Sequence, residues 1–159
     1  MEKLDRLVGA IQEEDRRLRE LLPQFPPDRR EKAGTGGTLS VKETLGHLAF
    51  WDSFAVLFFE RKLRGDRTDD GGAIDFEQRN RQEIKRLRSL PWLDVLERYD
   101  DATLRLAQFL RAHWADLSDR ERNDFATPLR HRRHHRLLLQ RTLGEWRPPA
   151  RAAQQAGTA

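Results

Sequence analysis

The sequence contains no cysteine and only one tyrosine and one methionine among its 159 residues. A chain without thiols forms no disulfide, no iron–sulfur cluster and no thiolate zinc site, so any metal site has to use histidine and carboxylate ligands. The absence of cysteine also fits a reducing compartment.

Long apolar runs are missing as well. The most apolar stretch extends from Leu45 to Phe59, contains His47 and Asp52, and is too short to span a bilayer. The charged N-terminus is not followed by the apolar segment of a signal peptide. These absences predict a cytoplasmic protein with no membrane-spanning segment.

Charge of one sign is not concentrated in one region. The chain has 30 Lys and Arg residues against 26 Asp and Glu residues, and the two signs are interspersed along the sequence. A dedicated nucleic-acid binder usually segregates its basic residues. A nucleic-acid partner is therefore not expected, and a small-molecule substrate is the more natural ligand.

What the sequence does contain is helical periodicity, because apolar residues recur at spacings of three and four. This pattern predicts four long helices, over about 3–22, 41–63, 91–114 and 128–146. Ser40 and Glu43 have the spacing of a capping box at the start of the second helix. The pattern predicts an all-α fold, a four-helix bundle.

The connections between these helices differ in length. Residues 64–90 form a long connection with a short helix over 76–87, and such a connection can cross the bundle. Residues 115–127 are acidic and polar, with Leu117 and Phe125 as anchors. The domain is predicted over 1–147, followed by a disordered Pro-, Ala- and Gln-rich tail over 148–159.

Three of the five histidines have the placement of metal ligands. His131 and His135 are four residues apart, so on a helix they share one face with Cβ atoms about 6 Å apart. His47 lies on the apolar stripe of another helix and could be the third ligand. Three imidazoles leave coordination positions open for water or substrate, as in a catalytic zinc site. The sequence therefore predicts a divalent-metal site, with zinc or nickel favoured among the ions that accept imidazole.

Two alternatives stay open at this stage. The spacing of His131 and His135 also arises by chance in a stretch as basic as 130–136, which could be a solvated face. Asp52 is the only charged residue between Thr44 and Phe59, so it either has a partner, orients an imidazole or positions substrate, or is solvated in a groove between helices.

The stretch from residue 39 to residue 51 reads Leu-Ser-Val-Lys-Glu-Thr-Leu-Gly-His-Leu-Ala-Phe-Trp. It resembles the segment that opens the second helix of the DinB-like superfamily, although Leu39 stands where tryptophan is usual. The later stretches 75–80 and 90–91, with Tyr99, are similar to the ClbS/DfsB-type branch and to the related N-terminal domain of mycothiol-dependent maleylpyruvate isomerase. The histidines at 131–135 match the late H-x-x-x-H of that superfamily.

The resemblance extends from the first helix to about Trp146, and it implies an up-down-down-up four-helix bundle with a long crossover between helices 2 and 3. It implies that His47, His131 and His135 hold a metal and that the protein is a homodimer. The implied function is a metal-dependent thiol S-transferase, with a low-molecular-weight thiol, or a hydrolase, in either case acting on reactive small molecules. The alternative is a non-catalytic small-molecule-binding or self-resistance protein without a metal.

The implied topology raises one geometric question. Helices 2 and 4 would be antiparallel, with His47 about two turns into the former and His131 near the start of the latter. The two rings lie at the same height only if the last helix begins earlier than residue 128 or is staggered.

Overall fold

The computed structural model describes residues 2–34, 38–66 and 75–146, and all regular elements in these ranges are helices. The four long ones are α1 (Glu2–Leu21), α3 (Val41–Leu63), α5 (Trp92–His113) and α7 (Ala126–Trp146). The short ones are η1 (Leu22–Gln24), α2 (Pro27–Arg30), α4 (Phe76–Arg88) and α6 (Asp119–Asp124). The all-α prediction is confirmed, whereas the tail predicted over 148–159 lies outside the described residues.

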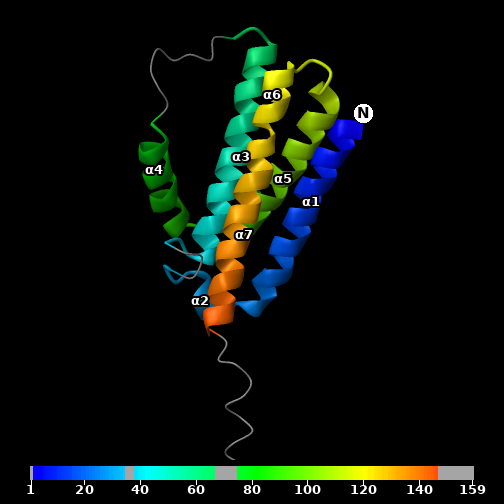
Figure 1. Cartoon of the computed structure of the whole chain (residues 1–159). Helices are drawn as coiled ribbons and strands as arrows, with labels where there is room; N and C mark the ends of the chain where they lie inside the picture. Colours follow the sequence, from blue (N-terminus) through cyan, green and yellow to red (C-terminus); the bar gives the residue numbers. More distant parts are fainter. Residues whose placement is uncertain (1, 35–37, 67–74, 147–159) are drawn as a thin grey trace, which may run out of the picture.

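The four long helices lie alongside one another (Figure 1). α3 packs most extensively on α5 and α1 on α7, and further contacts join α3 to α7 and α1 to α5. In the view of Figure 1, α1 and α7 run downward, whereas α3 and α5 run upward. No helix among the described residues combines the length and apolar character needed to cross a membrane.

The start of α3 follows from the capping box that the sequence predicts. Oγ of Ser40 accepts a hydrogen bond from the backbone N–H of Glu43 at 3.0 Å, and Oε2 of Glu43 accepts one from the backbone N–H of Ser40 at 2.8 Å. Both donors would otherwise be unsatisfied at a helix N-terminus. This cap fixes where the helix that carries His47 begins.

The short helix predicted over 76–87 is α4, which packs against α3. The close approach depends on Gly46, because a Cβ atom at this position would lie 2.1 Å from a methyl carbon of Leu87. Leu87 is only 1% exposed and belongs to the apolar core, so a side chain at position 46 would have to displace a packed residue. A glycine next to His47 therefore allows α4 to lie against the helix that carries that ring.

The last part of the chain differs from the prediction. Residues 115–127 were expected to form a polar connection, but they contain α6 and the start of α7, with only Phe125 between the two helices. A second capping box, formed by Ser118 and Glu121, begins α6. Its signal lies within an acidic stretch, where it was read as loop. Leu117 and Phe125 are buried anchors, as predicted.

The earlier helical start answers the question of ring heights. The ring of Phe125 lies 4.7 Å from that of Phe59, near the C-terminal end of α3, and Glu121 pairs with Lys62. α6 and the beginning of α7 therefore lie beside the end of α3, and α7 continues antiparallel to α3. This places His131 beside the N-terminal half of α3, level with His47.

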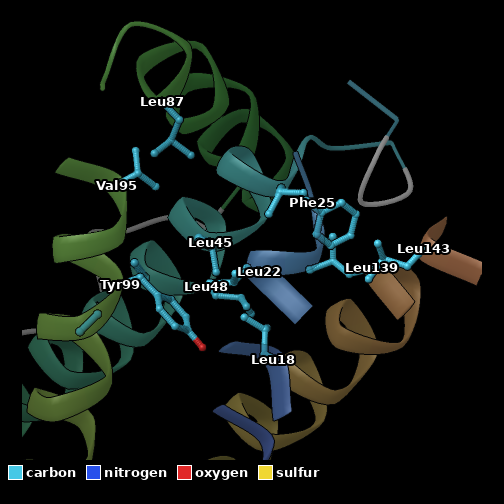
Figure 2. Close-up of a cluster of buried hydrophobic side chains, with 13 residues drawn as sticks. Leu18, Leu22, Phe25, Leu45, Leu48, Leu87, Val95, Tyr99, Leu139 and Leu143 are labelled. Atoms are coloured by element: carbon cyan, nitrogen blue, oxygen red, sulfur yellow. The ribbon is translucent and has the colours of Figure 1, made fainter. Parts of the chain in front are cut away.

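The core has two apolar clusters. One gathers residues from the lower part of the molecule in the view of Figure 1, and Figure 2 shows its side chains, including Leu18, Leu48, Tyr99 and Leu139. The other, at the opposite end, includes Val8, Val56, Leu106 and Phe125. Between them lies a layer of polar side chains, which we call the polar layer: Glu14, Asp15, His47, Asp52, Thr103, His131, Arg132 and His135.

Candidate metal centre

The structure brings the three sequence-predicted histidines together in the polar layer. Nε2 of His47, on α3, lies 2.9 Å from Nε2 of His131, on α7, and the latter lies 3.1 Å from Nε2 of His135. One ring nitrogen from each residue falls within a group whose members are all within 4.8 Å of one another. The rings meet edge to face, with centroids 4.7 to 5.1 Å apart.

This geometry can be compared with that of a metal centre. Imidazole nitrogens bind zinc at 2.0–2.1 Å, so two ligands of a tetrahedral ion lie about 3.3 Å apart. The two short contacts of His131 are within a few tenths of an ångström of that separation. The nitrogens of all three rings lie within 4.8 Å of one another, so a small rearrangement of the rings would bring them to the separations of metal ligands, and the residues present fit a three-histidine site.

Burial keeps the three rings neutral. It lowers the pKa of His47 and of His131 to about 4, and the cationic neighbours of His131 contribute to its shift. The pKa of His135 is lowered to about 3, again chiefly by burial. Since a metal ion binds the unprotonated imidazole, each of the three rings has one ring nitrogen with a lone pair for coordination at neutral pH.

The second ring nitrogen of these histidines has few hydrogen-bond partners among the described residues. Nδ1 of His135 is buried and has no hydrogen-bond partner. Metal-ligating histidines usually donate this second N–H to a carboxylate or carbonyl, which orients the ring. Across the described ranges, no hydrogen bond joins Asp52 to His47, His131 or His135, so packing rather than Asp52 orients these rings.

Asp52 instead lies against a buried arginine. Its carboxylate is 1% exposed, and Oδ2 lies 2.6 Å from Nη2 of Arg132, which is itself 0% exposed. Burial raises the pKa of Asp52 to about 6, although the guanidinium opposes this shift. Of the alternatives for Asp52, a partnered carboxylate is therefore the one that the structure contains, and the carboxylate is not solvated.

The arginine belongs to a wider network. Nη2 of Arg132 donates a hydrogen bond to Oγ1 of Thr103 at 2.8 Å, whereas Oδ2 of Asp52 is an ion-pair partner without a hydrogen bond of its own. The guanidinium carbon of Arg132 lies 5.6 Å from the centre of the Tyr99 ring. The hydroxyl of Tyr99 donates to Asp15 at 2.7 Å. Nε and Nη1 of Arg132 have no hydrogen-bond partner. The network joins side chains from all four long helices.

A pocket of about 540 Å³ opens beside the histidines. His47 and His131 form part of its wall, and most of the remaining lining is apolar. Its five aromatic residues are Trp51, Phe54, Phe59, Phe76 and Phe125. The candidate metal centre therefore faces a space large enough for a small organic molecule.

One wall of this pocket comes from α4, which sequence reasoning did not connect with the site. Nε1 of Trp51 donates a hydrogen bond to Oδ1 of Asn80 at 2.8 Å, and the ring of Phe76 lies 5.2 Å from that of Trp51. The periodicity of 76–87 predicts a helix but not its partner. The only local signal was Gly46, which marks a close approach on the face of α3 next to His47.

Arg132, which lies next to the histidine cluster, is the residue whose burial was hardest to predict from the sequence. The stretch 130–136 reads as a basic solvated face, yet only part of it is solvated: Arg133 and His134 are exposed, whereas Arg132 and His135 are buried. A signal was present, because Phe125, Arg132 and Leu139 are spaced by seven residues and all three are at most 1% exposed. His134 is exposed and also lines the pocket.

Comparisons with known proteins gave no match to any family model, curated protein or solved structure. The resemblance to DinB-like proteins therefore remains a prediction from the residues quoted above.

Proposed function

We propose that this protein binds one divalent metal ion, zinc or nickel, through His47, His131 and His135 and acts on a reactive small molecule in the adjoining pocket. The observation that carries the proposal is the convergence of the Nε2 atoms of three neutral imidazoles, two of which, His47 and His131, line an apolar pocket. Thiol S-transfer and hydrolysis are the two reaction classes that suit such a site. The proposal includes the DinB-like family, its up-down-down-up four-helix bundle and a homodimeric state.

A metal ion held by three imidazoles would lower the pKa of a coordinated thiol or water and so supply a nucleophile at neutral pH. The chain's own residues contribute the remainder of the site. The histidines present their lone pairs from two helices whose relative position is fixed by packing. The aromatic lining would hold the organic part of a substrate next to the rings.

The polar layer has a second task in this proposal. Asp52 pairs with Arg132 at 2.6 Å, and among the described residues no carboxylate hydrogen-bonds to His47, His131 or His135. A three-histidine site without a carboxylate ligand carries the full charge of the ion, which favours binding of an anionic nucleophile such as a thiolate or hydroxide.

The test is metal analysis of the untagged protein after incubation with zinc or nickel and removal of free metal. We expect about one ion per chain in the wild type and none in His47→Gln/His131→Gln/His135→Gln. The matched control is His113→Gln/His134→Gln, which removes the other two histidines and should retain the metal. Equal metal content in the triple variant and the wild type would refute the site.

One observation favours a metal-free alternative. Nε2 of His131 lies within hydrogen-bond distance of both neighbouring rings, so the cluster can also be held together by hydrogen bonds alone. In that case the pocket binds a small molecule without catalysing a reaction. A wild-type protein that takes up no metal yet still binds ligands in the pocket would support this second function.

A further inference from the structure

The pocket is a long slot rather than a round cavity at the histidines. Its lining on α3 extends from His47 to Phe59, twelve positions that correspond to about 18 Å of helix. On the opposite side the lining extends along α6 and α7 from Asp124 to His134. Since α3 and α7 are antiparallel, Phe59 and Phe125 close the end that lies farthest from the histidine cluster.

The two ends of the slot differ in chemistry. At one end are the imidazoles of His47 and His131, whereas at the other the rings of Phe59 and Phe125 lie 4.7 Å apart, both buried. Between the ends, Trp51 and Phe54 meet edge to face at 5.4 Å. A ligand that fills this space has a polar end and an apolar end.

The charged residues that line the slot are either paired with another side chain or exposed to solvent. Asp52 is paired with Arg132, and Asp124 and Arg130 are exposed residues. Arg79 lies with its guanidinium carbon 5.2 Å from the centre of the Phe54 ring, where it covers an aromatic face rather than offering an ion pair to the slot.

A second cavity of similar size shows that this lining is not a general property of the fold. It has a volume of about 530 Å³, lies between α3, α4 and α5, and is lined by five charged residues. These residues are Glu83, Arg86, Arg98, Asp101 and Arg105. The second cavity thus has a single aromatic residue, Phe50, where the cavity that meets the histidines has five.

From these features we infer that the slot binds an elongated, planar aromatic molecule whose single polar group lies at the histidine end. Several aromatic rings set at angles to one another offer both faces and edges, which favours an aromatic body over a flexible alkyl chain. This inference rests on the proposed function for the position of the polar group. Binding of the aromatic body in the apolar part of the slot does not depend on the metal.

The test uses three probes on the zinc-treated protein. 4-Phenylbenzohydroxamic acid combines a chelating head with a biphenyl tail, acetohydroxamic acid has the head alone, and 4-biphenylmethanol has the tail without a chelating group. Calorimetry should show the first probe binding about 100-fold more tightly than the second, because the tail removes apolar surface from water. 4-Biphenylmethanol should bind weakly and quench the fluorescence of Trp51.

A matched pair of variants locates the tail. Phe76 and Leu104 are equally exposed, at 56% each, but Phe76 lines the slot and Leu104 lines the second cavity. Phe76→Ala should weaken both biphenyl probes about tenfold and leave acetohydroxamic acid unchanged. Leu104→Ala should change none of the three affinities.

The outcomes separate the two proposals. If the protein takes up no zinc, neither hydroxamic acid gains affinity from its head, but biphenylmethanol still binds and remains sensitive to Phe76→Ala. That result overturns the metal site and supports the slot. If the biphenyl tail adds no affinity, or if Phe76→Ala and Leu104→Ala act alike, the inference about the aromatic ligand is wrong, whatever the metal content.

Discussion

The polar layer has two sides, which accommodate buried polar groups in different ways. On one side, which we call the sealed side, Asp52 and Arg132 are charged, almost inaccessible to water and paired with each other. On the other, which we call the open side, His47 and His131 are kept neutral by burial and border a pocket. The neighbouring residues His131 and Arg132 supply one group to each side.

The comparison shows how polar groups are tolerated between two apolar clusters. A buried charge is stable only when its partner is present, which constrains the positions of the helices that carry the pair. Neutral rings carry a smaller desolvation cost, so they can remain without fixed partners and keep their lone pairs for a ligand. The sealed side therefore contributes to helix register, and the open side to binding.

The largest expected effect comes from breaking the sealed side. Arg132→Met leaves Asp52 buried without its cation, and the free energy of unfolding should fall by about 3–5 kcal/mol. Urea unfolding followed by circular dichroism measures the change. The double variant Asp52→Leu/Arg132→Met should recover most of the loss, because Thr103 and Tyr99 keep other hydrogen-bond partners. A double variant as unstable as the single one would show that the pair is not the cause.

The histidines of the open side should make the free energy of unfolding depend on pH. In the metal-free protein the three histidines have native pKa values of about 3 to 4, whereas in the unfolded chain they titrate near pH 6.5. Between pH 7 and pH 5 the unfolded state therefore takes up protons that the native state does not, and stability falls as the pH falls. Asp52, with its pKa raised to about 6, acts in the opposite direction.

A comparison with the triple His→Gln variant removes the contribution of Asp52 and the other carboxylates. With EDTA present, the wild type should lose about 1–3 kcal/mol more than the variant between pH 7 and pH 5, a figure already reduced for the partial exposure of His47 and His131. The measurement is urea unfolding at each pH. Parallel stability curves for the two proteins would contradict the neutral cluster.

The last effect concerns the wall that α4 adds to the open side. Gly46→Ala should cost about 1–3 kcal/mol, because its methyl group would collide with Leu87. Gly144→Ala is the control, since this glycine of α7 has open space around it, and that substitution should stabilise the protein by about 0.5–1 kcal/mol. Thermal unfolding measures both. Two glycines that respond alike would show that α4 does not depend on the close contact.

The sequence predicts most of what depends on local spacing. Helical periodicity and the capping box at Ser40 predict α3 and its start, and the four-residue spacing of His131 and His135 places both rings on one face. His47 was recognised because a polar ring on an apolar stripe is unusual. These features need no knowledge of which helix lies next to which.

The features that could not be predicted from the sequence are contacts that depend on the relative register of neighbouring helices. Periodicity shows which face of a helix is buried, but not which residue of a neighbour lies opposite. The pairing of Asp52 with Arg132 and the contact of Leu87 with Gly46 join positions 80 and 41 residues apart and arise only once the helices are in register. The start of α6 was missed for another reason, since a charged stretch obscured its cap.

The close packing of α1 on α7 has a consequence for folding during synthesis. α1 buries Val8, Ile11 and Leu18, and its most extensive helix partner is α7, the described helix farthest from it in sequence. While the ribosome synthesises the intervening segments, the apolar face of α1 cannot yet pack against α7. Contacts of such long sequence separation slow folding and leave the nascent chain dependent on protection from aggregation.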